Sequence, residues 1–412
     1  MKNFAAAALV LSSLALAACG RPASSPRVAG AGDPTAHWTK TPAANPTQSS
    51  TLDGNSLAAP QSAAPQSAKL VGNPLNHDRA SKGQDLGAGP SSKSLSATPP
   101  PSAPPPSCTL PETGPAVGFY ARDPRPAQQV ALTFDDGPHP GKTPKVLNLL
   151  QKHKLHATFF VVGAAIRPGT YPLIQRMVAE GHVIGSHSYN HDVKMAARRP
   201  GRGSIDYVRG QHEVTRILID LALLAQSESD FTRLYTRVFE QKSVVYLPAK
   251  RLRAWPEFLA RHRLLLTEAG YGKNARPYDV LYSRPPGGGP YLEPSQKWQR
   301  EVYDTALREA GLVNVMWHDE SGDTNMEKKH DFTFLTGNLA RGFRRGGVVL
   351  IHDYIRTDAL TTALSALRKS DVKAVSLAEV TKHKYGCEEP VLRAELRPAP
   401  ASEGFGAVAA VK

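Results

Sequence analysis

Short apolar runs alternate with amphipathic segments through the second half of the chain. Apolar runs bounded by turn residues predict buried β-strands, and apolar residues at i, i+3, i+4 and i+7 predict helices. We predict strands at 129–134, 157–163, 182–185, 279–283, 312–317 and 348–351, and helices at 143–153, 171–181, 295–311, 335–346 and 361–370. Repeated β-α units predict a parallel sheet covered by helices, and a barrel or an open doubly wound sheet would both satisfy the pattern.

One stretch, residues 222–278, interrupts this alternation. It contains an amphipathic helix whose apolar positions are Phe231, Leu234, Tyr235, Val238 and Phe239, followed by a second apolar helix through WPEFLARHRLLLTEAG. Such stripes usually pack into a core, and a role in anchoring or partner binding stays open. Because the insertion follows a helix and precedes a strand, we expect it on the face opposite the carboxyl ends of the strands.

The amino-terminal 19 residues have the layout of a secretory signal: one Lys, a short apolar run and then small residues. The sequence LAAC, which ends at Cys19, resembles the lipobox of bacterial lipoproteins. That resemblance implies cleavage before Cys19 and lipid attachment to its sulfur. In a cell with two membranes, Gly20 favours the outer one. The alternative is a plain secretory signal with an incidental cysteine.

Residues 20–115 are rich in Pro, Ser, Ala, Gln and Gly, and this composition predicts a disordered tether. Residues 390–412 are again rich in Pro, Ala and Gly and are expected to be a flexible tail. The predicted folded domain is therefore 116–389.

The formal net charge of the chain is +14, and most of the basic excess falls within the predicted domain. An exported basic protein suits anionic envelope polymers or lipid headgroups, although a solvated surface accounts for most such charges. We find no nucleic-acid-binding signature, phosphate-binding Gly-rich loop or nucleophile elbow.

Two cysteines remain if Cys19 is lipidated, and they stand on either side of the predicted catalytic region. We propose that Cys108 and Cys387 form a disulfide in an oxidising compartment, with two unrelated thiols as the alternative.

Polar, titratable residues follow five of the predicted strands. Because parallel strands present their carboxyl ends on one rim, these residues are expected to form one active site. They are Asp135 and Asp136; His187 and His191; Arg284; the segment His318 to Asp323; and His352 and Asp353.

His187 and His191 are spaced i, i+4, which brings two imidazoles together. Two His and one carboxylate, with one position open for water, are a usual catalytic zinc arrangement. Asp135 and Asp136 supply the carboxylates, although Asp-Gly-Pro is also ordinary turn chemistry. His212, His262, His330 and His383 lack partners at ligand spacing, and we expect them to be exposed.

Five motifs occur in the order found in NodB-homology polysaccharide deacetylases, carbohydrate esterase family four, which the chain resembles over roughly 125–385 without the insertion. They are TFDDGP (133–138), HSYNH (187–191), RPPGG (284–288), WHDESGD (317–323) and VVLIHD (348–353). The resemblance implies a distorted (β/α) barrel and a divalent metal, most commonly zinc.

The same resemblance implies the residue roles. Asp136, His187 and His191 would be the metal ligands. Asp135 would be the general base and His352 the general acid. Arg284 and Asp323 would orient these two groups, and the backbone N–H of Gly287 would help to stabilise the oxyanion.

Amide hydrolysis needs these parts, because a bound metal polarises the acetyl carbonyl and lowers the pKa of water while base and acid move protons. The third and fourth motifs depart from the family pattern: Gly287 stands where Tyr is frequent, Glu320 where Asp is usual, and Thr324 where a Trp would line the sugar site. These departures affect substrate recognition.

We therefore expect a lipid-anchored, metal-dependent N-deacetylase of an envelope or extracellular amino-sugar polymer, which could be peptidoglycan, chitin-like oligomers or poly-N-acetylglucosamine. O-deacetylation of a polysaccharide and a non-catalytic glycan-binding lipoprotein are the alternatives. A purely structural zinc fits poorly, because such sites usually have four protein ligands.

Overall fold

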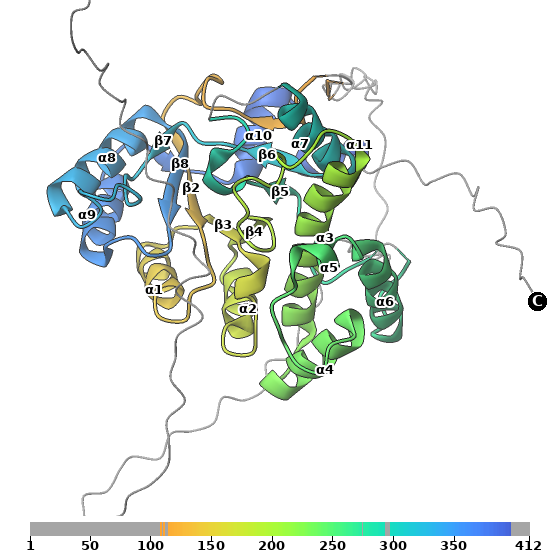
Figure 1. Cartoon of the computed structure of the whole chain (residues 1–412). Coiled ribbons are helices and arrows are strands. Elements are labelled where there is room, and N and C mark those ends of the chain that lie inside the picture. Colours follow the sequence, from red (N-terminus) through yellow and green to blue (C-terminus); the bar gives the residue numbers. More distant parts are fainter. Residues whose placement is uncertain (1–107, 109, 112–113, 274, 293–296, 397–412) are drawn as a thin grey trace, which may run out of the picture. The chain divides into compact units, whose positions relative to one another are not determined.

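The computed structural model describes residues 108, 110–111, 114–273, 275–292 and 297–396. Its centre is one sheet of nine strands, in the order β1-β6-β5-β4-β3-β2-β8-β7, with β9 paired to β2 (Figure 1). Every strand pairing is parallel. The strands are β1 (Gly118–Phe119), β2 (Gln129–Asp135), β3 (Thr158–Val161), β4 (Val183–Ser186), β5 (Tyr282–Ser283), β6 (Val313–Val315), β7 (Asp319–Glu320), β8 (Gly347–His352) and β9 (Lys373–Ala374).

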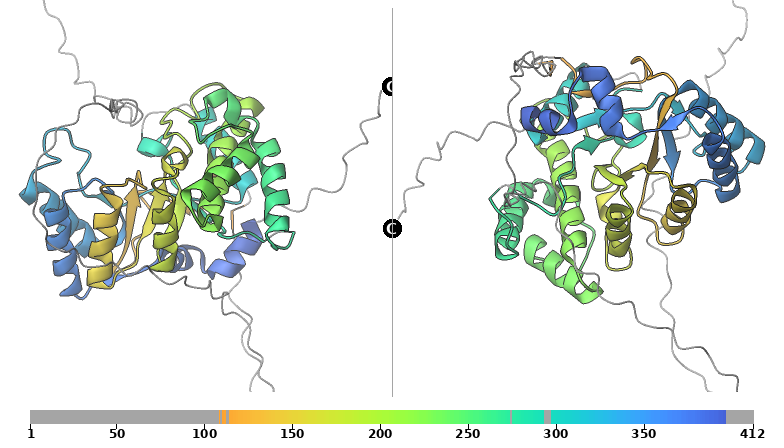
Figure 2. Two further views of the ribbon diagram at one scale, coloured as in Figure 1. Left: turned by 90° about the horizontal axis from the view of Figure 1, so that it is seen from below. Right: turned by 180° about the vertical axis from the view of Figure 1, so that it is seen from behind.

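Helices cover this sheet. Their bounds are α1 (Thr143–His153), α2 (Tyr171–Ala179), α3 (Arg202–Leu224), α4 (Glu228–Phe239), α5 (Ala249–Leu252), α6 (Trp255–Glu268), α7 (Lys297–Ala310), α8 (Phe332–Arg345), α9 (Thr357–Arg368), α10 (Leu377–Tyr385) and α11 (Glu389–Leu396), with short 3₁₀ turns η2 (Gly163–Ala165) and η3 (Pro286–Gly288). Figure 2 shows the blue pair α8 and α9 at one end of the sheet and the green helices α3 to α6 at the other. The predicted fold class, a distorted (β/α) barrel, is confirmed.

The central strands are apolar because they are covered on both faces. From Val130 to Asp135 every residue of β2 is buried, and all six residues of β8 beside it are buried as well. A parallel strand buried on both faces reads as a continuous apolar run. This is why the sequence pattern located β2, β3 and β8, whereas the two-residue strands β1, β7 and β9 carry no such run.

The long helix α3 connects the barrel to the insertion. Sixteen of its residues are buried, and it packs against α2, α7 and the insertion helices. Gly210 permits the crossing with α5, because a Cβ at this position would lie 2.2 Å from the carbonyl oxygen of Leu252. Within the predicted insertion the chain forms α4, α5 and α6, and the five apolar positions predicted for the first of these helices are all buried.

The expected position of the insertion is wrong for residues 245–247, which join α4 to α5. The backbone N–H of Leu247 donates a hydrogen bond of 2.7 Å to the Tyr189 hydroxyl, and the rings of Tyr189 and Tyr246 lie 5.7 Å apart. Tyr189 stands between His187 and His191, on the loop that follows β4. Connectivity fixes only where the insertion leaves and re-enters the sheet, so it leaves the path between those points free.

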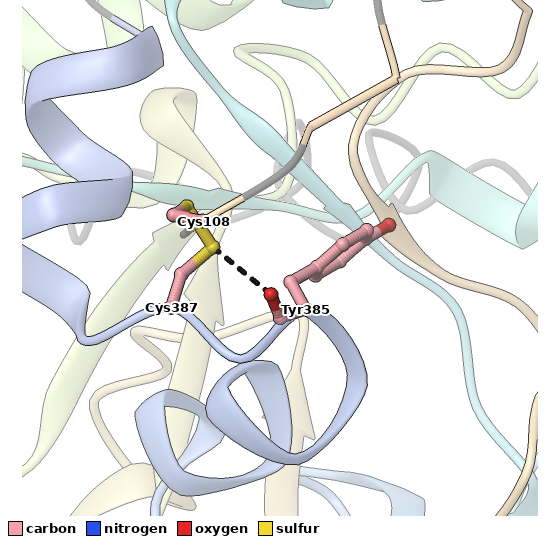
Figure 3. Close-up of a disulfide and its surroundings, with 3 residues drawn as sticks. All are labelled: Cys108, Tyr385 and Cys387. Atoms are coloured by element: carbon pink, nitrogen blue, oxygen red, sulfur yellow. Dashed lines mark hydrogen bonds between the residues drawn. A yellow bond between two sulfur atoms is a disulfide. The ribbon is translucent and has the colours of Figure 1, made fainter. Parts of the chain in front are cut away.

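A disulfide joins Cys108 to Cys387, the pair that the sequence analysis proposes (Figure 3). The bond links positions 279 residues apart and lies between α10 and α11. It therefore ties the start of the described chain to the end of the folded domain.

The flexible tail was expected from residue 390, but the chain is still helical there. Residues 389–396 form α11, in which Leu392 is buried and Arg393 donates to the carbonyl oxygen of Asp279 at 2.7 Å. The prolines of the segment favoured a tail, whereas Leu392 and the partly buried Leu396 pack this helix against the core. Residues 397–412, the signal segment 1–19 with Cys19, and the tether up to residue 107 lie outside the described residues.

Two histidines expected at the surface are buried. The His212 ring shares a 2.9 Å hydrogen bond with the Ser186 hydroxyl, and His262 lies 3.3 Å from Asp220. His212 lies in α3 and His262 in α6, and the spacing of apolar residues in these helices does not reveal a buried polar partner. In the part of the chain that the structure describes, no helix combines the length and the apolar character needed to cross a membrane.

Candidate metal centre and active site

Asp136, His187 and His191 converge after the ends of β2 and β4. Oδ1 of Asp136 lies 3.5 Å from Nε2 of His187 and 3.2 Å from Nε2 of His191. The three potential ligand atoms all lie within 4.8 Å of one another, so one ion could contact all of them. Two imidazoles and one carboxylate are a usual protein contribution to a catalytic zinc site, in which a further position stays open.

The state of these side chains fits a divalent cation. Nδ1 of His187 lies 2.9 Å from the carbonyl oxygen of Arg284, so it carries the ring proton and leaves a lone pair on Nε2. Burial lowers the pKa of His187 to about 4, although the charge of Asp135 opposes this, and the ring is therefore neutral at neutral pH. Metal-binding histidines need this neutral form.

Asp136 offers an anionic oxygen at the same point. Burial raises the pKa of its carboxyl, but the three histidines around it, led by His191, outweigh burial and hold that pKa well below its ordinary value. Its Oδ1 atom is buried and receives no hydrogen bond of good geometry. A buried carboxylate oxygen without a donor is costly, and a cation at this point would satisfy it.

Local backbone conformation sets the direction of the candidate ligand side chains. Asp136 and His191 both adopt the left-handed conformation, with φ of 71° and 56°. Non-glycine residues seldom adopt this region, but Asp and His are among those that occur in it most often. Gly137 next to Asp136 must lack a side chain, because a Cβ there would lie 2.4 Å from a carboxylate oxygen of Asp353.

Gln211 of α3 holds the loop that carries both histidines. Its fully buried side chain accepts hydrogen bonds from the backbone N–H groups of Tyr189 at 2.9 Å and Asn190 at 3.1 Å. Its amide nitrogen donates to Oδ1 of Asn190 at 2.6 Å and to the Tyr207 hydroxyl at 2.9 Å. Gln211 is not predicted from the sequence, because a glutamine in an amphipathic helix belongs to no motif.

Asp135 lies beside the candidate metal ligands and is anchored by Arg284. Nη1 of the fully buried Arg284 donates to Oδ1 of Asp135 and to Oγ1 of Thr133, each at 2.8 Å. Nε of Arg284 donates to the carbonyl oxygen of Val315, also at 2.8 Å. The second oxygen of Asp135, Oδ2, faces Nε2 of His187 at 3.6 Å. Arg284 thus fixes one carboxylate oxygen and leaves the other directed towards the candidate metal site.

His352 and Asp323 form a second charged pair. Nδ1 of His352 lies 2.8 Å from Oδ1 of Asp323, and the backbone N–H of His352 donates to Oδ2 at the same distance. Burial would lower the pKa of His352, but the Asp323 charge and hydrogen bond outweigh it and raise that pKa to about 10. The imidazole is therefore protonated at neutral pH and can act as an acid.

Two further residues complete this part of the site. The ring of Tyr354 stacks on His352 with 5.0 Å between centroids. Asp353, which the sequence places on the same rim without a role, is buried and accepts a hydrogen bond from Thr143.

Gly287 lies in η3 with φ of 59°, and a Cβ there would lie 3.2 Å from a methyl group of Val193. The glycine therefore approaches the chain just beyond His191. Its expected contribution to an oxyanion site stays a prediction.

The fold and site together define a class: a parallel α/β protein with a candidate metal centre at the carboxyl ends of its strands, flanked by an anchored carboxylate and a protonated imidazole. Comparison with known proteins agrees. The family model described as "Polysaccharide deacetylase" matches residues 122–218. A chitooligosaccharide deacetylase of Sinorhizobium fredii is 49% identical over 260 residues, which cover 63% of this chain and 88% of that protein.

A peptidoglycan-N-acetylglucosamine deacetylase of Bacillus cereus is 26% identical over 263 residues, which cover 62% of this chain and 89% of that protein. Among solved structures, a pseudoenzyme of carbohydrate esterase family four from Bacillus anthracis is similar, with a TM-score of 0.41 and 19% identity over 66% of this chain and 70% of that one. The chain belongs to the NodB-homology polysaccharide deacetylases.

Proposed function

We propose that this protein is a metal-dependent hydrolase that removes N-acetyl groups from an amino-sugar polysaccharide of the cell envelope or extracellular matrix. The observation that carries the proposal is the convergence of Asp136, His187 and His191 beside Asp135. The relatives named above act on chitooligosaccharide and on peptidoglycan N-acetylglucosamine, which supports this substrate class.

Asp136, His187 and His191 would hold the ion, with zinc as the proposed metal. When bound, such an ion supplies Lewis acidity to the acetyl carbonyl and lowers the pKa of water. The donor set of two neutral imidazoles and one carboxylate suits this metal.

Asp135 and His352 carry out the two proton transfers of the reaction. Asp135 accepts the proton of the attacking water through Oδ2, while Arg284 holds Oδ1. His352 donates its proton to the amide nitrogen as the C–N bond breaks, so that acetate and a free amine are the products. Asp323 holds the imidazole in position and keeps it protonated before the transfer.

We propose further that the protein is exported and held at the bacterial cell envelope by a lipid on Cys19. The signal-like amino terminus and the LAAC sequence support this, and the disulfide between Cys108 and Cys387 is typical of proteins from oxidising compartments.

Acetate release from a panel of acetylated glycans tests the activity. The panel should contain peptidoglycan, chitin oligomers, poly-N-acetylglucosamine and an O-acetylated polysaccharide, each with and without a chelator. New free amines indicate N-deacetylation, whereas acetate without new amines indicates O-deacetylation.

Asp135→Asn should lower kcat by about 10²–10⁴-fold, the usual contribution of a positioned base. Asp371→Asn, which changes an exposed carboxyl in the same way, is the matched control and should leave kcat unchanged. Equal turnover by the wild type and Asp135→Asn would overturn the proposed mechanism. Glycan binding without turnover by the metal-loaded wild type would favour the non-catalytic alternative.

A further inference from the structure

Tyr354 lies in the turn between β8 and α9, two residues after the proposed acid. Backbone hydrogen bonds hold this turn on both sides of the tyrosine. The N–H of Asp353 donates to the carbonyl oxygen of Asp135 at 3.1 Å, and the N–H of Ile355 donates to the carbonyl oxygen of His352 at 3.0 Å. The end of β8 therefore fixes the point from which the Tyr354 side chain projects.

Tyr354 differs from its two neighbours in burial. Asp353 and Ile355 are buried, with exposed fractions of 2% and 4%, whereas Tyr354 is 42% exposed. An apolar group stabilises a fold in proportion to the surface that it removes from water, so a half-exposed ring contributes less than a buried one. The fold should therefore tolerate a change of this side chain, and an effect on the site can be separated from an effect on stability.

The ring of Tyr354 covers one face of the His352 imidazole. The two ring centroids lie 5.0 Å apart and the ring planes make an angle of 18°, which is a stacked arrangement. The other restraint on this imidazole is the 2.8 Å hydrogen bond between its Nδ1 atom and Asp323. A bond to one ring atom leaves the ring able to tilt about that bond, whereas a flat neighbour opposes the tilt. Asp323 and Tyr354 thus restrain the proposed acid in different ways.

The hydroxyl of Tyr354 lies at the candidate metal centre, where it is a hydrogen-bond partner of the Asp136 carboxylate. A phenol keeps its proton at neutral pH, so the hydroxyl donates and the carboxylate accepts. Carboxylates that bind a metal are usually held by such outer hydrogen bonds, which orient the ligand and affect the affinity for the metal. One side chain therefore contacts both a candidate metal ligand and the proposed acid.

We propose that Tyr354 is a positioning residue that links the metal centre to the proton donor, because its hydroxyl orients Asp136 and its ring orients His352. The inference rests on the proposed function, to which the roles of Asp136 and His352 belong. The last of the five sequence motifs ends at Asp353, so the resemblance assigns no role to Tyr354.

Two substitutions in the full-length protein separate the hydroxyl from the ring. Tyr354→Phe removes the hydroxyl and keeps the ring, whereas Tyr354→Leu removes both. Tyr271→Phe removes a hydroxyl from a partly buried tyrosine that follows α6, and it is the matched control. Zinc affinity is measured by competition with a chelator, and kcat and KM are measured at saturating zinc on a glycan that the wild type deacetylates. Urea unfolding checks that each variant keeps its fold.

The two substitutions should affect different steps. Tyr354→Phe and Tyr354→Leu should both bind zinc about tenfold more weakly than the wild type, and Tyr271→Phe should bind it equally well. At saturating zinc, Tyr354→Phe should keep the kcat of the wild type. Tyr354→Leu should lower kcat by about tenfold to hundredfold with a smaller change in KM, because a misplaced proton donor weakens the transition state more than it weakens binding.

The outcomes that contradict the inference are distinct from failure of the proposed function. Equal zinc affinity of the wild type and Tyr354→Phe would overturn the role of the hydroxyl, and equal kcat of the wild type and Tyr354→Leu would overturn that of the ring. A wild type that binds zinc but deacetylates no glycan would overturn the proposed function and the role of the ring, while the zinc comparison would still decide the role of the hydroxyl. A wild type that binds no zinc would overturn both proposals.

Discussion

Asp135 and His352 are direct partners in the register of two adjacent parallel strands, β2 and β8. The proposed base and acid therefore stand on the most extensively paired strands of the sheet, and each is held by its own buried partner, Arg284 or Asp323. Hydrogen bonds of neighbouring strands fix the separation of the two groups. The proposed proton acceptor and donor are thus placed by the core of the fold, whereas the proposed metal ligands His187 and His191 lie on a loop.

Replacing Asp323 should alter the pH dependence of the reaction. Asp323 is the main cause of the raised pKa of His352, so Asp323→Asn should lower that pKa. An acid must be protonated to act, so activity falls as pH rises through the pKa of His352. The alkaline limb of kcat against pH should therefore move to lower pH in Asp323→Asn. An unchanged alkaline limb in this variant would show that His352 is not the acid.

Gln211→Ala should lower the affinity of the protein for zinc. The substitution removes the acceptor for the N–H groups of Tyr189 and Asn190, and loss of such supporting bonds typically costs about 10–100-fold in metal affinity. Zinc affinity measured by competition with a chelator checks this. Gln175→Ala, which removes an amide that caps the end of α3 instead, is the control and should retain the affinity of the wild type.

Stability should fall in mild acid partly through His182. Nδ1 of this buried ring accepts a hydrogen bond from the N–H of Ala157 at 3.2 Å, and burial lowers its pKa from 6.5 to about 4. The unfolded chain then binds more protons than the folded chain between these two pH values, so the free energy of unfolding decreases as pH falls from 6.5 to 4. Urea unfolding at pH 7 and pH 5 should show a smaller pH effect in His182→Asn than in the wild type. The exposed His383→Asn should behave like the wild type, and an equal pH effect in all three proteins would contradict the prediction.

The Cys108–Cys387 disulfide should contribute substantially to stability. It closes a loop of 279 residues, and removing a native disulfide typically costs about 2–5 kcal/mol. The variant Cys108→Ala/Cys387→Ala should therefore unfold at a lower urea concentration than the wild type. A reducing agent should shift the midpoint of the wild type towards that of the variant and leave the variant unchanged. Equal midpoints under oxidising conditions would refute the prediction.

The sequence alone predicted those site residues that lie in contiguous motifs. Asp135 and Asp136 end an apolar strand, and His187 and His191 follow another, so strand order alone brings them to one rim. Arg284 was found for the same reason. Its partner Thr133 was not, since the bond between them crosses the sheet and leaves no local pattern.

Other contacts depend on packing that a single sequence does not reveal. Gln211 contacts the loop that carries His187 and His191 from α3, the helix that follows this loop in the chain. Leu247 contacts the same loop from the insertion. Gln211 lies among the apolar positions of a packed helix, and Leu247 lies in the segment that joins α4 to α5, so neither residue belongs to a motif. The strands β1, β7 and β9 were missed because they carry no apolar run, and α11 was missed because its eight residues make only about two turns.

The contact between Leu247 and Tyr189 means that the insertion cannot be deleted without affecting the site. Excising α4 to α6 would remove a hydrogen bond from the histidine-bearing loop and leave apolar side chains of α3 facing water. A shortened version would then lose catalytic competence and solubility together, even though every residue proposed to touch the acetyl group would still be present. The added helices therefore belong to the structural core that supports the proposed active site.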